Sequence, residues 1–272
     1  MPVLVTAAQH PLARRVAARI LAEGGEVRVT ADGDVGSLRA QGAFVAHASA
    51  DDEGRLEAAL QDVHTLVHVG GGIATATPDR LVADAEVVAR AATGAGIRRL
   101  VALSLPGAAD DADEPLRRAK AAVERVLAGV PCQTIVLRVG LVDTAWLRDA
   151  LLTAGLAPEL LAAVVRPVRV EDLLELVVAF DRARAAAPAG HLVVAADGPV
   201  ARTVVGYLDR VTGSSGGRAS RVGRRLPAPR AVERLAAVLA GPWDQDGEVA
   251  AGRLLDGWSF AGLEPAEPSP AR

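Results

Sequence analysis

Cysteine is nearly absent from this sequence, since Cys132 is the only one among 272 residues. A single cysteine excludes a disulfide within the chain and a thiolate metal cluster, which agrees with a reducing compartment. The histidines do not suggest a metal site either, because His47 and His64 have no ligand-like spacing with acidic partners. We therefore expect a cytoplasmic protein that binds no metal.

Aromatic residues and long apolar runs are also scarce. Only 3% of the residues are aromatic although 50% are hydrophobic, so Ala, Val and Leu must form the core by close packing of small side chains. No run approaches the roughly 20 apolar residues that span a bilayer, and the first residues do not read as a signal peptide. The formal net charge of −3 gives no field that would attract nucleic acid. We expect neither a membrane nor nucleic acid as a partner.

The sequence does have a regular alternation of strand and helix signals before residue 140. Short apolar runs alternate with segments whose apolar residues recur at helical spacing. The predicted strands lie at residues 3–6, 26–30, 43–47, 65–69, 99–104 and 134–138, and the predicted helices at 12–21, 37–41, 55–61, 79–93 and 115–128. Such alternation predicts an α/β protein of Rossmann type, with a doubly wound parallel sheet covered by helices on both faces.

The pattern loosens after residue 145. Helices are predicted at 146–153, 171–185 and 204–212, and strands at 168–170 and 191–195. We expect a Rossmann-type nucleotide-binding domain over residues 1–145 and a smaller C-terminal, substrate-side region over 146–263, which forms the far wall of a cleft above the strand ends. The Pro-rich residues 264–272 are predicted to form a disordered tail.

Five short motifs follow one another in a set order. They are Val-Leu-Val-Thr at 3–6, Val-His-Thr-Leu-Val-His at 63–68, Gly-Ile-Arg-Arg-Leu-Val at 96–101, Leu-Arg-Val-Gly at 137–140 and Arg-Pro-Val-Arg-Val-Glu-Asp at 166–172. In this order they resemble the extended and atypical short-chain dehydrogenase/reductase superfamily, especially its NmrA-like proteins. The resemblance implies an NAD or NADP cofactor, a small-molecule ligand and a homodimer.

The phosphate-binding turn departs from the motif of that family. The family motif Thr-Gly-x-x-Gly-x-x-Gly begins here with Thr6, but Ala7, His10 and Ala13 replace its three glycines. Glycine lets such a turn adopt a positive φ and lets the backbone approach the diphosphate. Ala7 therefore strains the turn if its φ is positive, and His10 places an imidazole where the diphosphate would bind. If a dinucleotide binds, its contacts on this turn are Thr6, Ala7, His10 and Leu12.

The catalytic pair of the family, Tyr-x-x-x-Lys, is incomplete. Lys120 occupies the lysine position, but Leu116 stands at the tyrosine position and the only tyrosine, Tyr207, lies far along the chain. Ser104 matches the first of two serines that commonly end the fifth strand, and Leu105 replaces the second. The lysine helps to lower the pKa of the tyrosine that moves a proton during hydride transfer, so the usual mechanism cannot operate. The candidate catalytic residues that remain are Ser104, Lys120 and His10.

Further candidate contacts follow the second and fourth predicted strands. Asp32 lies where an acidic residue would take the ribose hydroxyls of NAD and repel the 2′-phosphate of NADP, but Asp-Gly is also a turn dipeptide. Gly70, Gly71 and Gly72 lie at the ligand edge of the sheet, where they either let a flat group approach the backbone or form a flexible loop. Lys120 either binds a ribose or an anionic substrate, or is a solvated lysine.

Two other features of the sequence have an ordinary structural explanation. His68 lies within an apolar strand, which is typical of a core histidine with a hydrogen-bond partner. A run of arginines either grips a carboxylate or phosphate or forms a solvated surface. These arginines are Arg218, Arg221, Arg224, Arg225 and Arg230.

Three functions stay open at this point. The first is a divergent NmrA-like protein that binds a small organic ligand in the cleft and catalyses a redox-neutral isomerisation, elimination or cyclisation, or a reduction with an unorthodox proton donor. The second is a non-catalytic ligand-sensing or regulatory protein, as NmrA-type proteins work as cofactor sensors. The third is an NAD-dependent oxidoreductase with an unorthodox phosphate turn. The lost glycines and tyrosine favour the second over the third, whereas the polar groups at the cleft mouth favour chemistry.

Overall fold

The computed structural model describes residues 1–48, 52–71, 77–153, 155–183, 190–212, 229–241, 243, 249–250 and 255. Its strands are Val3–Val5 (β1), Val27–Thr30 (β2), Phe44–Ala46 (β3), Thr65–His68 (β4), Arg99–Ser104 (β5), Gln133–Val139 (β6), Leu141–Asp143 (β7), Val164–Val165 (β8), Pro167–Arg169 (β9), His191–Ala196 (β10), Arg202–Thr203 (β11) and Val249–Ala250 (β12). Its helices are Pro11–Ala22 (α1), Gly36–Ala40 (α2), Glu53–Leu60 (α3), Pro78–Ala95 (α4), Pro115–Ala128 (α5), Ala145–Thr153 (α6), Pro158–Ala162 (α7), Val170–Arg182 (α8), Val204–Thr212 (α9) and Pro229–Leu239 (α10).

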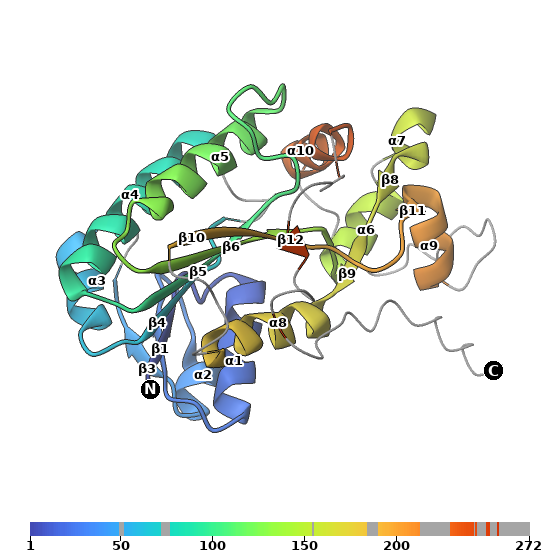
Figure 1. Ribbon diagram of the computed structural model, residues 1–272. Coiled ribbons are helices and arrows are strands. Elements are labelled where there is room, and N and C mark those ends of the chain that lie inside the picture. Colours follow the sequence, from blue (N-terminus) through green and yellow to red (C-terminus); the bar gives the residue numbers. More distant parts are fainter. Residues whose placement is uncertain are drawn as a thin grey trace, which may run out of the picture.

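Eight of the described strands form one parallel sheet, in the order β12-β10-β6-β5-β4-β1-β2-β3 (Figure 1). The chain builds outward from β1 to β3 and then returns to pair β4 with the other side of β1. Val3 therefore lies opposite both Val27 and Thr65. The strand order reverses between β1 and β4, and doubly wound sheets bind their ligands at the carboxyl ends of the strands beside such a reversal. The predicted Rossmann-type fold is confirmed.

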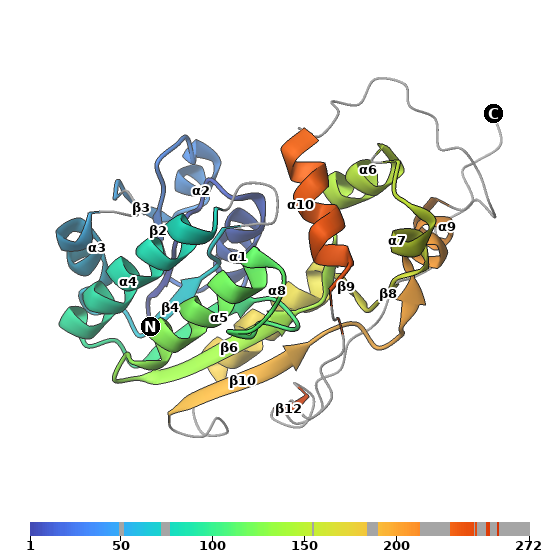
Figure 2. The ribbon, with the colours of Figure 1, turned by 90° about the horizontal axis from the view of Figure 1, so that it is seen from above.

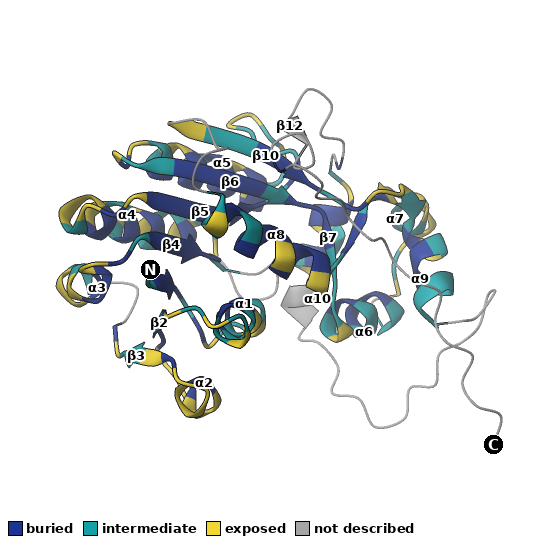
Figure 3. Ribbon diagram, turned by 60° about the horizontal axis from the view of Figure 1, so that its bottom comes forward, coloured by how far each residue is buried: buried dark blue, intermediate teal, exposed yellow. Residues whose placement is uncertain are grey.

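Helices cover both faces of this sheet. Successive residues of a strand point to opposite faces, so Leu66 joins the core under α3, α4 and α5, whereas its neighbour Val67 joins the core under α1, α2 and α8. Figure 3 shows the central strands as buried and the exposed residues on the outer sides of the helices. A sheet buried on both faces explains why its strands are almost continuous apolar runs.

The segments after residue 145 contribute both to the sheet and to a smaller layer beyond it. Strand β10 pairs with β6 from His191 to Ala196, and α8 packs against α1. Figure 2 shows α6, α7, α9 and α10 gathered beyond the carboxyl ends of the sheet strands. The short strands of this part of the chain form two two-stranded sheets, β7–β9 and β8–β11. Leu147, Tyr207 and Leu235 of this layer are buried and extend the core that lies under α5. This layer stands opposite the strand ends, as the predicted cleft requires.

The longer predicted elements are confirmed within the described residues, and the shortest ones were missed. The missed elements β7, α7, β8, β11 and β12 have two to five residues each, too few to show a period. The predicted tail at 264–272 and the arginine-rich residues 218–225 lie outside the described residues, as does the side chain of Arg230. No helix in the described ranges is both long enough and apolar enough to cross a bilayer.

A buried arginine joins β5 to the end of α8. Arg99 is only 4% exposed, and its guanidinium donates to the backbone oxygens of Phe180, Asp181 and Ala183 and to Oε1 of Gln133. The last carbonyls of a helix have no partners inside the helix and carry partial negative charge, so a cation there satisfies and stabilises them.

Replacing Arg99 by Met should lower the free energy of unfolding by about 3 kcal/mol, because Met keeps the aliphatic packing but leaves several carbonyls without a donor. Urea unfolding followed by circular dichroism measures this change. Arg98→Met, at the exposed neighbouring position, is the matched control and should change the free energy by less than about 0.5 kcal/mol. Equal losses in the two variants would contradict the role given to Arg99.

Candidate functional site

The turn between β1 and α1 keeps the backbone shape of a glycine turn without its glycine. Ala7 has φ 55°, in the left-handed region. Thr30 at the end of β2 holds this turn: its Oγ1 accepts from the Ala7 N–H at 3.3 Å, and its carbonyl accepts from the Ala8 N–H at 2.8 Å. The expected strain at Ala7 is therefore present, at a cost of about 1 kcal/mol for a residue with a Cβ.

His10 occupies the start of α1, where a diphosphate would bind. Its Nδ1 accepts the backbone N–H of Leu12 at 3.3 Å, and the intervening Pro11 has no N–H to offer. A helix start binds a diphosphate through free backbone N–H groups. The residues present do not fit a dinucleotide diphosphate in this arrangement, because the imidazole has taken both the space and a donor.

A cleft of about 1020 Å³ opens at the carboxyl ends of the strands. It is bounded by α1, α5, α6 and the residues that follow β5 and β6. Five residues predicted from the sequence line it: His10, Leu12, Gly71, Ser104 and Lys120. Most of the wall is apolar and includes Leu103, Leu105, Leu116, Val139, Trp146 and Trp243.

Lys120 and Leu116 both line the cleft from α5, one helical turn apart. Lys120 is 5% exposed, and its Nζ donates to the backbone oxygen of Leu103 at 3.2 Å. Burial lowers the pKa of Lys120 to about 8, although the nearby Glu124 carboxylate opposes the shift. Lys120 is also the only lysine in the chain, whose other basic residues are 29 arginines. The reading of Lys120 as a solvated surface lysine is wrong.

His68, Thr6 and Gly70 lie beside this amine. The Nδ1 of His68 and the Oγ1 of Thr6 are 3.1 Å apart, and both side chains are buried. Desolvation, assisted by the charge of Lys120, lowers the pKa of His68 to about 4, so this ring is neutral near pH 7. Gly70 has φ 65°, and a Cβ there would lie 3.2 Å from Nζ of Lys120 and 3.7 Å from Nε2 of His68. Gly70 therefore leaves the room that the amine occupies.

Ser104 is held by an ion pair that the sequence did not reveal. Its hydroxyl donates to Oε1 of Glu124, and Glu124 also accepts from Nε and Nη2 of Arg138 at 3.1 and 2.7 Å. Glu124 is buried although it lies in a charged helix segment that reads as solvated. Arg138 stands opposite Ser104 in the register of β6 and β5, and this pairing brings the three residues together.

A second polar group missed from the sequence lies on the C-terminal wall of the cleft. Arg148 donates through Nε and Nη2 to the two carboxylate oxygens of Asp143, both at 2.6 Å, and Tyr207 donates to the same carboxylate. Asp143 and Arg148 line the cleft, whereas Tyr207 is fully buried behind them. Burial and the Asp143 carboxylate raise the pKa of Tyr207 well above its usual value. Tyr207 therefore does not replace the missing catalytic tyrosine.

The remaining residues that the sequence predicted as ligand contacts do not all lie at the cleft. Asp32 is exposed at the end of β2 and does not line the cleft, and Gly72 lies outside the described residues. His10 lies partly buried near Lys120, and desolvation followed by the charge of Lys120 lowers its pKa. Among the described residues, no group of three or more His, Cys, Asp and Glu side chains could hold a metal ion.

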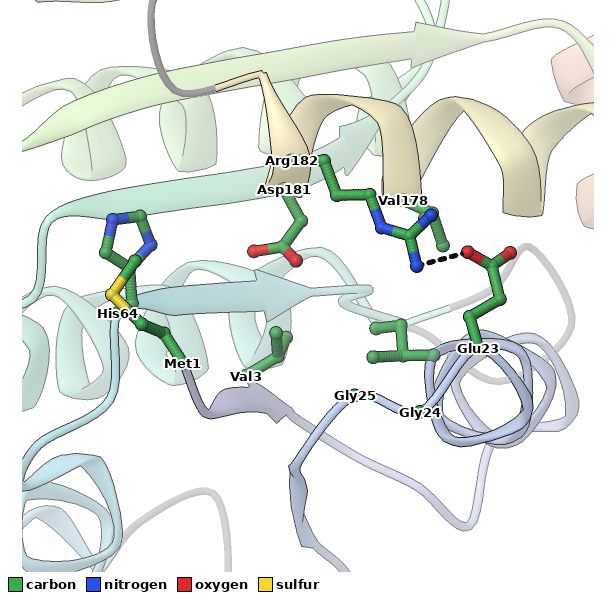
Figure 4. Close-up of a pocket in the computed structure, with 10 residues that line it drawn as sticks. Met1, Val3, Glu23, Gly24, Gly25, His64, Val178, Asp181 and Arg182 are labelled. Atoms are coloured by element: carbon green, nitrogen blue, oxygen red, sulfur yellow. Dashed lines mark ion pairs between the residues drawn. The ribbon is translucent and has the colours of Figure 1, made fainter.

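Figure 4 shows a smaller hollow of about 370 Å³ at the opposite end of the sheet. It adjoins Val3 at the start of β1 and His64 just before β4, and Arg182 of α8 reaches across to Glu23 after α1 at 2.5 Å. Open α/β sheets bind ligands at the carboxyl ends of their strands, so the larger cleft is the candidate site.

The sequence matches no protein-family model and no curated protein. Solved structures with a similar fold include the triphenylmethane reductase of Citrobacter sp. in complex with NADP(H), at 17% identity and a TM-score of 0.76, with 97% of each chain covered. The UDP-glucuronic acid 4-epimerase of Bacillus cereus, in complex with UDP-glucuronic acid and NAD, has 14% identity and a TM-score of 0.68, with 97% of this chain and 95% of that chain covered.

A short-chain dehydrogenase/reductase superfamily protein of Agrobacterium tumefaciens with bound NAD has 17% identity and a TM-score of 0.61, with 79% of this chain and 83% of that chain covered. At these identities the likenesses establish the fold. This chain therefore has the fold of the extended short-chain dehydrogenase/reductase proteins, as the order of its motifs predicted.

Replacing Ala7 by Gly should raise the free energy of unfolding by about 0.5 to 1 kcal/mol, because glycine adopts φ 55° without a Cβ clash. Urea unfolding measures the change. Ala8→Gly is the matched control: Ala8 is buried and has no positive φ, so this change should lower the free energy by about 1 kcal/mol. A loss of stability in Ala7→Gly would show that the turn is not strained.

The stability of the chain should rise relative to that of a Lys120→Met variant between pH 8 and 10. The pKa of Lys120 is about 8 in the folded chain and 10.5 without perturbation. In this window the unfolded chain holds a proton that the folded chain has released, so raising the pH favours folding. Urea unfolding of both chains at pH 7.5 and pH 10 measures the effect. Arg118→Met, in which an exposed arginine is lost, should show a pH-independent difference from the wild type; the same behaviour in Lys120→Met would refute the lowered pKa.

Proposed function

We propose that this chain binds a small organic molecule with an apolar body in the cleft and catalyses a redox-neutral reaction in which Lys120 moves a proton. The observation that carries the proposal is the arrangement of Lys120 and Leu116 on one wall of the cleft. The lysine of the family's catalytic pair is present and buried. Leu116, one helical turn before it, replaces the tyrosine that moves a proton during hydride transfer.

The apolar wall sets the kind of molecule that fits. Leu105, Leu116, Trp146 and Trp243 offer hydrocarbon and aromatic surface, which favours a ligand that buries an apolar body. Among the described residues that line the cleft, four ionisable side chains are basic, those of Arg15, Lys120, Arg148 and Arg169, and two are acidic, those of Asp143 and Glu171. This local excess of positive charge, in a chain whose net charge is −3, favours a ligand with an electronegative group such as a carbonyl or carboxylate.

Lys120 has the properties of a proton carrier. With a pKa of about 8, both its charged and its neutral form are populated near neutrality. The neutral amine can take a proton from a carbon beside a carbonyl group, and the ammonium can return it to another atom of the same molecule. His10, with its lowered pKa, is a second acceptor at the cleft wall. Such a cycle needs no oxidant and returns Lys120 to its starting state.

Dinucleotide-dependent oxidoreduction is the second candidate. The NAD and NADP(H) complexes of proteins with this fold favour it, as does the glycine-like φ of Ala7. The blocked start of α1 and the missing phenol oppose it. A non-catalytic ligand sensor would use the same cleft, and the loss of the tyrosine is compatible with it, but a buried amine of lowered pKa favours chemistry.

Calorimetric titration with NAD, NADH, NADP and NADPH tests the proposal. We expect no saturable binding in the micromolar range, because His10 occupies the diphosphate position. His10→Gly should allow binding, as it removes the imidazole and frees the Leu12 N–H. His47→Gly, which changes an exposed histidine on another part of the surface, is the control and should behave like the wild type. Micromolar binding to the wild-type chain would refute the proposal and favour the oxidoreductase.

A further inference from the structure

The chain uses arginine for every basic position except one. Arginine serves the exposed ion pairs, and it also serves the buried structural positions Arg99 and Arg117 and the partly buried Arg138. A guanidinium stays protonated in proteins, whereas an amine can lose its proton when buried and then act as a nucleophile. A position that required only a cation could carry arginine here, as the others do. Lys120 therefore marks a place where an amine is needed.

The surroundings of Nζ offer the amine one hydrogen-bond acceptor and a position without a side chain. The Leu103 carbonyl accepts one of its N–H groups at 3.2 Å, and the absence of a side chain at Gly70 provides space on the β4 side. Leu103, Gly71 and Lys120 all line the cleft. The amine is therefore carried by a buried residue of the cleft wall, next to the residues that a bound molecule would contact.

We propose that Lys120 forms an imine with the carbonyl carbon of an aldehyde or ketone that binds in this cleft. The proposal rests on the proposed function, since it names the substrate class of the same site and the way in which the amine acts on it. The substrate is then a carbonyl compound whose apolar body lies against Leu105, Leu116 and Trp146.

The reaction is balanced without a further reactant. The lone pair of the neutral Nζ forms a bond to the carbonyl carbon, the π electrons of C=O move to oxygen, and oxygen takes up the proton that nitrogen releases. The hydroxyl of the resulting carbinolamine takes up a second proton and leaves as water while the nitrogen lone pair forms the C=N bond, which gives a protonated imine and one water molecule. The protonated imine withdraws electrons from the neighbouring carbon, and transfer of a proton from that carbon to water or His10 permits isomerisation or elimination. Hydrolysis returns the free amine.

The charged and titratable groups around the amine are compatible with this chemistry. Burial supplies the neutral amine by lowering the pKa of Lys120 to about 8. On the β4 side His68 is neutral near pH 7, because its pKa is about 4. At the start of α1, burial and the charge of Lys120 lower the pKa of His10. Glu124, one turn further along α5, is neutralised by Arg138. Both imidazoles thus have a lowered pKa, which disfavours a second positive charge beside the amine.

Reductive trapping tests the proposal directly, because the chain offers a single lysine. The full-length protein with an added Arg118→Lys substitution carries a second amine, exposed and two residues away on the same helix. It is incubated at pH 7.5 with 2-naphthaldehyde and sodium cyanoborohydride, and peptide mass spectrometry follows both positions. We expect Lys120 to be labelled at least about tenfold faster than the introduced lysine, since an exposed lysine with a pKa near 10.4 is almost fully protonated at this pH.

Two controls connect the labelling to the folded site. Unfolding the same protein in urea should equalise the two rates, and Lys120→Arg combined with Arg118→Lys should leave only the slow position. Labelling of Lys120 no faster than that of the introduced lysine, in protein that circular dichroism shows to be folded, would overturn the imine proposal. That result would leave the proposed function in place if no dinucleotide binds. Micromolar dinucleotide binding with fast labelling would instead overturn the proposed function and leave the imine.

Discussion

Burial of the parallel sheet on both faces is the constraint on which the site depends. Helices cover each face, so the middle of every central strand must be apolar, and polar side chains can enter only where the strands end. Thr6, His68, Ser104 and Arg138 lie at the carboxyl ends of β1, β4, β5 and β6. Each finds a partner among buried neighbours: Thr6 with His68, and Ser104 with the Glu124–Arg138 pair. The register that builds the core therefore also sets these groups along one edge of the sheet, where Ser104 lines the cleft together with Lys120.

The turn after β1 has the backbone conformation of a glycine turn but different side chains facing a ligand. The backbone at Ala7 keeps the positive φ of the glycine turn, because hydrogen bonds from the Ala7 and Ala8 N–H groups to Thr30 hold the turn against the end of β2. The strain of about 1 kcal/mol is small beside the burial of β1 and α1. His10, in contrast, changes what the turn can bind, since the imidazole satisfies an N–H that would otherwise face a diphosphate. The turn thus keeps its backbone conformation while the groups that it offers to a ligand differ from those of the glycine motif.

Local sequence patterns predicted the sheet, its flanking helices and the strained Ala7, because alternation of apolar runs and the spacing of a turn motif are local properties. They also predicted Ser104, Lys120 and His10 on one cleft, since these follow strand ends or lie on the helix after β5. They could not predict the burial of Glu124 or the chain from Tyr207 through Asp143 to Arg148. Asp143 and Arg148 are five residues apart, but the other contacts join residues 14 to 64 apart. Their members look like solvated charges until the register of β5 and β6 and the packing of α9 on α6 are known.

The single lysine connects these observations. Burying an ionisable amine in an apolar wall costs free energy unless the amine can release its proton. Arginine has no such release, yet this chain buries arginines where backbone carbonyls accept from the guanidinium, as at Arg99 and Arg117. At Lys120 the direct partner is one carbonyl, and Gly70 is left without a side chain beside it. A guanidinium has five N–H donors, so a single carbonyl would leave most of them without an acceptor. A neutral amine has fewer donors, and the Leu103 carbonyl accepts from one of them. This environment therefore favours the deprotonated amine, the form that the proposed function requires.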